Sequence, residues 1–89
     1  MNMKRWVIVF RVLANINRLK IIRILSDGRE MNVTEISEAI RISVKATSNH
    51  LVMLKSLDVL NGHGKSGHVF YSLNQQLPED FKRSIKLFL

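Results

Sequence analysis

The sequence predicts a mainly α-helical domain with one small β-hairpin, and its 89 residues suit a single domain, 1–89, with one modest core. Apolar residues recur at helical spacing in five segments, which are 4–14, 16–26, 33–40, 44–56 and 78–88. Residues 59–73 differ, because β-branched and aromatic residues there flank a glycine-rich stretch, a pattern typical of a hairpin.

Asn15 separates the first two helical segments and can cap the second. Residues 4–14 are apolar on almost every side, so a helix there is expected to be buried on more than one face. The segment 16–26 carries one apolar stripe, formed by Leu19, Ile22 and Leu25 with Ile21 and Ile24 beside it. Gly28 follows, and it suits the left-handed position that ends many helices.

Two helices joined by a tight turn are predicted at 33–56. Asn32 and Glu35 have the spacing of a capping box, and Ser43 can cap the helix that follows. The inward residues are expected to be Val33, Ile36 and Ile40 in the shorter helix and Val44, Thr47, Leu51 and Leu54 in the longer one. Such a pair forms a helix-turn-helix.

The hairpin is predicted to have strands at 59–61 and 69–73, with the loop 62–67 between them. Met31 could supply a short third strand. Pro78 opens the last helix, whose first turn holds acidic residues and whose apolar stripe is Phe81, Ile85 and Phe88. The order of helices and strands, α-α-(β)-α-α-β-β-α, predicts a winged helix-turn-helix.

The charge balance favours a polyanionic partner. Fourteen Lys and Arg against seven Asp and Glu give a net charge of +7, which points first to nucleic acid and second to an anionic membrane surface. A basic protein without such a partner remains the alternative. The apolar run 6–10 is shorter than a signal peptide core and far shorter than the roughly 18 residues of a membrane span. We therefore expect a cytoplasmic protein with no membrane partner.

The second helix of a helix-turn-helix enters the DNA major groove with its N-terminal half. Lys45, Ala46, Asn49 and Met53 lie opposite the predicted buried stripe of 44–56. We expect the first three to read bases, since Asn can bond an adenine edge, Ala can touch a thymine methyl and Lys can meet guanine or phosphate. A solvated helix face is the alternative.

Phosphate contacts are expected from the same helix and from the hairpin, whose glycines allow a close approach to the DNA backbone. The expected residues are Ser43, Thr47, Ser48, His50, His63, Lys65 and His68. A capping role for Ser43 and a half-buried packing role for Thr47 remain equally open. For His50, a bond to the neighbouring backbone is as open as a phosphate contact, and both are favoured over a metal-binding role.

The sequence has no constellation of catalytic residues. Its three histidines lack a paired nucleophile, and 61–67 lacks the strand-to-helix context of a phosphate-binding loop. Cysteine is absent, which excludes disulfides and thiolate metal ligands, and we expect no carboxylate or third ligand near the two hairpin histidines. We expect no enzymatic activity, no cofactor and no metal.

Three stretches resemble the ArsR/SmtB family of small bacterial and archaeal transcription regulators. The family motifs that they match are a Leu-Ala-Asp-Pro-Thr-Arg-type segment, a Ser-x-His-Leu-x-x-Leu pattern and the Tyr-x-Leu pair of the wing. The matching residues are Leu13, Ala14, Asn15 and Arg18, then Ser48, His50, Leu51 and Leu54, then Tyr71 and Leu73. The resemblance covers about residues 10–73 and implies a homodimeric winged-helix DNA-binding regulator, typically a repressor released by an effector.

Three departures from the family pattern matter. Asn32 and Thr34 stand where many members carry a Cys-Val-Cys pair, and the last helix has no histidine and no suitable acid pattern. We therefore expect neither of the family's two common metal sites. Arg41 and Asp58 occupy turn positions where glycine is usual, at a cost of roughly 1 kcal/mol each if those turns are left-handed.

The homodimer is expected to form through the terminal helices, 4–14 and 78–88. The expected interface residues are Trp6, Val9, Phe10, Leu13, Phe81, Ile85 and Phe88. The competing possibility is a monomer whose last helix packs on its own domain. The predicted function is sequence-specific binding of an inverted repeat in double-stranded DNA by a homodimeric repressor. A protein-docking module of a transcription complex and a nonspecific chromatin-type DNA binder are the alternatives, and the effector and operator are left open.

Overall fold

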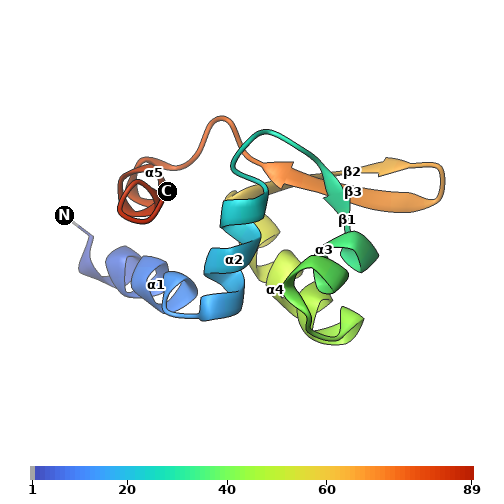
Figure 1. Ribbon diagram of the computed structural model, residues 1–89. Coiled ribbons are helices and arrows are strands. Elements are labelled where there is room, and N and C mark those ends of the chain that lie inside the picture. Colours follow the sequence, from blue (N-terminus) through green and yellow to red (C-terminus); the bar gives the residue numbers. More distant parts are fainter. Residues whose placement is uncertain (1) are drawn as a thin grey trace.

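Residues 2–89 are described by a computed structural model, in which helices and strands follow the predicted winged helix-turn-helix order (Figure 1). The elements are α1 (Met3–Leu13), α2 (Ile16–Ile24), β1 (Met31–Asn32), α3 (Val33–Ile40), α4 (Val44–Ser56), β2 (Leu60–Lys65), β3 (His68–Leu73) and α5 (Glu79–Ile85). The three strands form one antiparallel sheet in the order β1-β3-β2, so the short third strand expected at Met31 is confirmed.

The molecule is elongated, with principal extents of 42 × 24 × 21 Å. Helices α1 and α5 lie together at one end, where both chain termini are also found (Figure 1). The β2–β3 hairpin and the N-terminal half of α4 lie toward the other end, and α2 stands between the two groups. The fold therefore separates the terminal helices from the helix-turn-helix and its wing.

One apolar core connects these parts. Every helix and the base of the hairpin contribute to it, and the buried residues are Val9, Val12, Ile21, Ile22, Leu25, Ile36, Ile40, Leu51, Leu54, Val59, Leu60, Phe81 and Ile85. Full burial of one such aliphatic side chain contributes roughly 1.5–3 kcal/mol. The core thus includes Phe81 and Ile85 of α5, which bind that helix to its own chain.

The predicted helix caps are present. The Asn15 side chain accepts from the backbone amides of Asn17 and Arg18, which starts α2. At α3, Glu35 N donates to the Asn32 side chain and Asn32 N donates to the Glu35 carboxylate, both at 2.9 Å. This reciprocal pair is a capping box and confirms the prediction.

The two turn residues that depart from the family's usual glycine, Arg41 and Asp58, lie in the left-handed region. Arg41 has φ 60° where α3 ends, and Asp58 has φ 61° between α4 and β2. Gly28, with φ 90°, takes the left-handed position predicted for it. Arg41 and Asp58 each carry a conformational cost of roughly 1 kcal/mol that glycine would avoid.

The hairpin differs from the prediction of a six-residue loop. Strand β2 continues to Lys65 and β3 begins at His68, so only Ser66 and Gly67 form the turn. Their φ angles are 53° and 78°, the positive values that a tight two-residue hairpin turn requires. The glycine-rich stretch pairs as a strand because Gly62 faces Tyr71, whose ring would lie 3.3 Å from a Cβ at that position.

Smaller differences concern helix ends and one side chain. Helix α5 spans Glu79–Ile85 and is shorter than the predicted 78–88, and α2 ends at Ile24. The prediction of an inward Val44 is wrong, since its side chain is 48% exposed. Val44 occupies the first turn of α4, where no neighbouring element covers it, while Leu51 and Leu54 further along are buried.

Candidate nucleic-acid interface

The outward face of α4 carries the residues predicted to read bases. Lys45 and Asn49 are exposed, whereas Ala46 is half-buried at one side of the helix. Met53, one turn further on, is also exposed. The structure therefore brings two of the three predicted base-reading residues onto one open face in the N-terminal half of α4.

The side chains of Ser43 and Thr47 form hydrogen bonds with the backbone at the start of α4. The Ser43 hydroxyl accepts from Ala46 N at 3.0 Å, which makes Ser43 the cap. The Thr47 side chain is fully buried, and its hydroxyl donates to the Ser43 carbonyl at 2.8 Å. A buried hydroxyl cannot contact phosphate, so that expectation for Thr47 is corrected to a packing role.

A second exposed row on α4 joins Ser48, one of the expected phosphate contacts, to two valines whose exposure was not predicted. Val44, Ser48 and Val52 are spaced four residues apart, and all three are exposed, Val52 to 61%. This spacing places them on one flank of the helix. Helical spacing alone is consistent with this row, but it also allows Val44 to lie on the stripe of Leu51 and Leu54, where we expected it.

His50 contacts Arg18, a partner that sequence reasoning did not identify. The Arg18 Nη1 lies 3.4 Å from His50 Nδ1. Arg18 also donates from Nε to the Val12 carbonyl at 2.6 Å and from Nη2 to the Arg11 carbonyl at 3.1 Å. Burial, and second the positive charge of Arg18, lower the pKa of His50.

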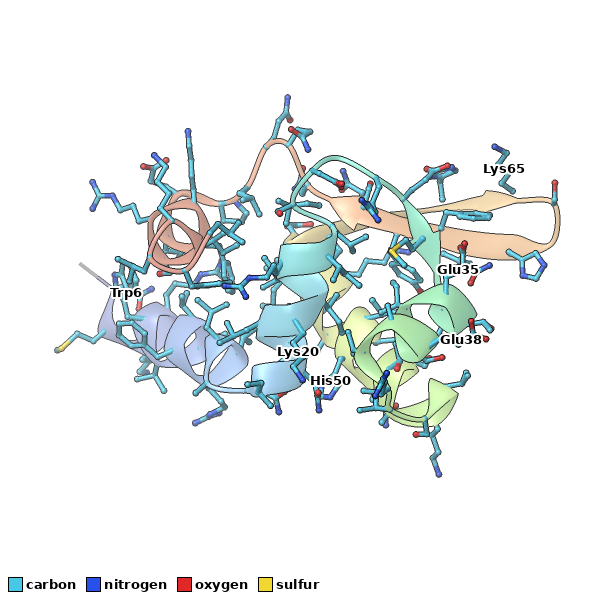
Figure 2. All side chains as sticks on the ribbon, viewed as in Figure 1. Trp6, Lys20, Glu35, Glu38, His50 and Lys65 are labelled. Atoms are coloured by element: carbon cyan, nitrogen blue, oxygen red, sulfur yellow. The ribbon has the colours of Figure 1, made fainter. Side chains whose placement is uncertain are left out.

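Alternation along β2 and β3 places the polar residues of the hairpin on one face. His63 pairs with Phe70 and Lys65 with His68, and the two histidine rings lie 6.3 and 6.5 Å from the Phe70 ring. Lys65 stands near the outer end of the hairpin (Figure 2). The structure thus brings together the three hairpin residues predicted to meet phosphate.

His63 has a second neighbour outside the hairpin. Its Nε2 lies 3.2 Å from a carboxylate oxygen of Glu30, in the segment before β1, so the expectation that no carboxylate lies near the hairpin histidines is wrong. Both side chains are well exposed, so this contact contributes little to stability. Nowhere in residues 2–89 do three histidine or carboxylate side chains gather into a set that could hold a metal.

Burial of residues in the terminal helices contradicts part of the predicted dimer interface. Val9, Phe81 and Ile85 are buried in the core of their own chain and are not available to a second subunit. Trp6, Leu13 and Phe88 are half-buried and pack against that core. Phe10 alone among the predicted interface residues is largely exposed, to 60%. An apolar stripe on a helix with little polar surface does not reveal which face turns inward.

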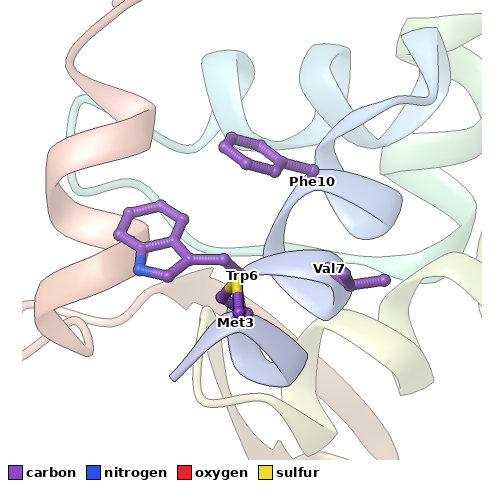
Figure 3. Close-up of a pocket in the computed structure, with 4 residues that line it drawn as sticks. All are labelled: Met3, Trp6, Val7 and Phe10. Atoms are coloured by element: carbon purple, nitrogen blue, oxygen red, sulfur yellow. The ribbon is translucent and has the colours of Figure 1, made fainter. Parts of the chain in front are cut away.

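The outward face of α1 presents an apolar groove. Met3, Trp6, Val7 and Phe10 line an open space of about 490 Å³ (Figure 3). The rings of Trp6 and Phe10 lie 5.4 Å apart in a tilted arrangement. Met3 and Val7 were missed from the sequence, although their spacing from Phe10 matches one helical face.

No helix within residues 2–89 combines the length and apolar content needed to cross a bilayer.

Comparisons with known proteins place the chain in a family. The model of the family described as bacterial regulatory protein, arsR family, matches residues 15–61. The transcriptional repressor SdpR of Bacillus subtilis is 35% identical over 72 residues, which cover 81% of this chain and 79% of SdpR. The cadmium resistance regulatory protein CadC of Listeria innocua is 40% identical over 62 residues, 70% of this chain but only 52% of CadC.

Solved structures show the same fold. HlyU from Vibrio cholerae superposes with a TM-score of 0.78 at 31% identity, covering 97% of this chain and 89% of HlyU. The homodimeric winged helix-turn-helix DNA-binding domain of Mb0332 from Mycobacterium bovis has a TM-score of 0.76 at 26% identity, covering 96% of this chain and 75% of that domain. The chain therefore belongs to the arsR family of bacterial regulatory proteins, which are transcriptional regulators and not enzymes.

Proposed function

We propose that this protein regulates transcription by binding an inverted repeat in double-stranded DNA as a homodimer. The observation that carries the proposal is the exposure of Lys45 and Asn49 on α4, together with a hairpin that bears the exposed residues His63, Lys65 and His68. A net charge of +7 on each subunit adds attraction for DNA along its whole length. SdpR and Mb0332, which are named as a repressor and a DNA-binding domain, support the same function.

The proposed roles on α4 follow from side-chain chemistry. Asn49 bonds an adenine edge, Lys45 meets guanine or phosphate, and Ala46 touches a thymine methyl from the side of the helix. Ser43, Ser48 and His50 contact phosphate near the groove edge. The cap bond of Ser43 uses its oxygen as an acceptor, which leaves its hydroxyl hydrogen to donate to a phosphate.

The hairpin supplies sequence-independent affinity in this proposal. Lys65 follows His63 by two residues and pairs with His68, so the three side chains lie on one face of the hairpin. A cation that neutralises a phosphate releases a counterion, so its contribution weakens as salt rises. The hairpin therefore positions the protein on DNA and α4 reads the sequence.

The homodimer is proposed to form on α1. Its outward residues Met3, Val7 and Phe10 are exposed and apolar, and the exposed Leu87 and Leu89 follow α5, which lies at the same end of the molecule as α1. Burial of this surface against a second copy would remove it from water. A two-fold axis there would present two copies of α4 to successive major grooves, about 34 Å apart.

Repression is the proposed direction of regulation, in line with the name of SdpR, although the relative HlyU is named an activator. A repressor excludes polymerase by occupying a promoter, which needs only the DNA contacts described here. Transcription in vitro from a promoter that carries the selected site tests the direction. Lower transcript yield with added protein supports repression, and higher yield contradicts it.

The central experiment is selection of bound duplexes from a random pool, followed by titration at several salt concentrations. Recovery of an imperfect inverted repeat, with affinity that falls steeply with salt, supports the proposal. Asn49→Ala is the matched variant, because it should retain nonspecific binding while losing preference at one position in each half-site of the enriched repeat. Binding without any enriched sequence indicates a nonspecific DNA binder, and no binding at all favours a protein-docking module. Either result contradicts the proposal.

A further inference from the structure

Arg18 joins three elements through one guanidinium group. Its Nε and Nη2 donate to the carbonyls of Val12 and Arg11 in the last turn of α1, and its Nη1 approaches His50 of α4. Arg18 itself belongs to the first turn of α2. Figure 2 shows His50 near that end of α2. Two bonds to α1 hold the guanidinium in place, so Nη1 is presented to His50 from a fixed position.

The chemistry of this contact determines where His50 carries its proton. A guanidinium has five N–H donors and no acceptor, so Arg18 can only donate to His50. The Nδ1 atom must then be unprotonated, which leaves the proton of the neutral ring on Nε2. Burial and the nearby positive charge also lower the pKa of His50, which favours the neutral ring.

The other edge of the ring has no partner. Among residues 2–89, Nε2 of His50 makes no hydrogen bond or ion pair, and the residue is half-buried with an accessible part. The two ring nitrogens point in diverging directions, so an Nδ1 that faces Arg18 leaves Nε2–H directed away from it. His50 follows Asn49 directly and lies four residues after Ala46, in the middle of α4.

We propose that Arg18 is a positioning residue that fixes His50 as the neutral Nε2–H tautomer, and that this N–H donates to a DNA phosphate oxygen. The phosphate contact rests on the proposed DNA-binding function, whereas the tautomer does not. His50 then differs in kind from Lys65, because a neutral donor displaces no counterion. It adds affinity without adding to the salt dependence.

The tautomer is tested first in the protein without DNA. Two-bond ¹H–¹⁵N correlation spectra of the imidazole rings at neutral pH distinguish a protonated Nε2 from a protonated Nδ1, and His63 and His68 serve as internal references. We expect the pattern of an Nε2–H ring at His50. In Arg18→Met, the tautomers should mix and the pKa of His50 should rise. A wild-type His50 that is protonated at Nδ1, or mixed, overturns the proposal without recourse to any variant.

The phosphate contact is tested with His50→Gln and His50→Asn on the selected duplex. The Gln amide nitrogen reaches about as far as Nε2, and the Asn amide corresponds to Nδ1. We expect His50→Gln to retain affinity and His50→Asn to bind about tenfold more weakly, in line with loss of one bond to a charged group. The dependence of log K on log salt should have the same slope in all three proteins.

A salt slope that falls by about one unit in His50→Gln would show that His50 binds as an imidazolium, which overturns the neutral donor. Equal affinity of His50→Asn and wild type would overturn the phosphate contact. Failure of the wild type to bind any duplex would end the proposed function and the phosphate contact together. The tautomer spectra of the free protein would still stand, so the two failures are distinguishable.

Discussion

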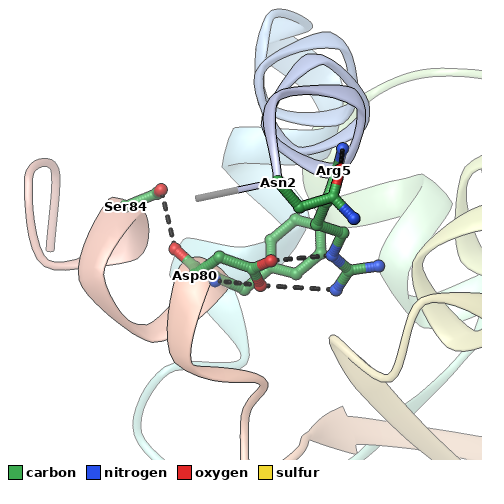
Figure 4. Close-up of polar contacts among 5 residues, drawn as sticks. Asn2, Arg5, Asp80 and Ser84 are labelled. Atoms are coloured by element: carbon green, nitrogen blue, oxygen red, sulfur yellow. Dashed lines mark hydrogen bonds and ion pairs between the residues drawn. The ribbon is translucent and has the colours of Figure 1, made fainter.

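Arg5 and Asp80, which are 75 residues apart in the chain, form a bidentate ion pair that links α1 to α5 (Figure 4). Arg5 Nε donates to one carboxylate oxygen at 2.7 Å and Nη2 approaches the other at 3.3 Å. The guanidinium carbon also lies 5.3 Å from the centre of the Phe81 ring. The hydrogen bond from Arg5 is the main reason that the pKa of Asp80 is held below its usual range.

This pair predicts a loss of stability in acid. A carboxyl whose pKa is lower in the folded state stabilises the fold above its unfolded pKa of about 3.8, and that contribution disappears as the pH falls through the folded pKa. Asp80→Asn should therefore reduce the free energy of unfolding by about 1 kcal/mol at neutral pH, since the Asp80 side chain is only 19% exposed.

Urea unfolding at neutral pH and at several acidic pH values tests this expectation. The difference between wild type and Asp80→Asn should shrink as the pH falls below about 3.8. Glu79→Gln is the control, because Glu79 pairs with Arg83 on an exposed surface and should change stability little. A constant difference at all pH values would exclude the ion pair as its cause.

Asn49→Ala and Lys65→Ala should alter DNA binding in different ways. Loss of a base contact by Asn49 should cost roughly 1–3 kcal/mol and relax preference at one position in each half-site. Loss of a phosphate contact by Lys65 should weaken all sequences alike and reduce the salt slope by about one unit. Titration of matched and mismatched duplexes at several salt concentrations separates them. Identical effects from both substitutions would refute the assignment.

The elements of the fold could be predicted because their signals are local. Caps such as Asn15 and the pair Asn32 and Glu35 are set by side chains within three residues of each other, and they start helices where expected. The hairpin loop could not be predicted, because glycines at 62 and 64 favour a loop by composition while their pairing with β3 depends on Tyr71 and Val69. Cross-strand packing overrides local preference there.

The candidate site was predictable only in part, for the same reason. Exposure of Lys45 and Asn49 follows from helical spacing, and so does the burial of Leu51. The contact of Arg18 with His50 joins residues 32 positions apart, and the periodicity of apolar residues does not predict a contact at that distance in the chain. Likewise, the apolar run of α1 could not show that Val9 faces the core while Phe10 faces solvent.

Zinc, cadmium and arsenite are each expected to leave DNA affinity unchanged. The sequence has no cysteine to provide a thiolate, although the relative CadC is named for cadmium resistance. Titration of the selected duplex with and without each metal tests this expectation. Stoichiometric zinc binding by calorimetry, coupled to release of the duplex, would contradict it and would point to histidines shared between subunits.

Arg41→Gly should stabilise the fold. Arg41 has φ 60° where α3 ends, and glycine adopts this conformation without the clash of a Cβ. The expected gain in the free energy of unfolding is about 1 kcal/mol, reduced by the greater freedom of glycine in the unfolded chain. Arg41→Ala, which keeps the Cβ, should bring no such gain. Equal urea midpoints for Arg41→Gly and Arg41→Ala would exclude backbone strain at this turn.

Phe10→Glu should convert the proposed homodimer into a folded monomer. Phe10 is 60% exposed and lies beside Met3 and Val7, so a carboxylate there leaves the core of the subunit intact and opposes burial against a second copy. Phe88, which packs against the core, is a less clean test because its substitution would also disturb folding.

Sedimentation at micromolar concentration, together with titration of the inverted repeat, measures the outcome. Phe10→Glu should sediment as a monomer with the helical circular dichroism of the wild type, and it should lose most of its affinity for the repeat because two linked half-sites no longer bind together. Val69→Glu is the sedimentation control, since Val69 is an exposed apolar residue on the hairpin, away from α1. It should remain dimeric. A monomeric wild type under these conditions would remove α1 as a dimer surface and with it the two-fold arrangement that an inverted repeat requires.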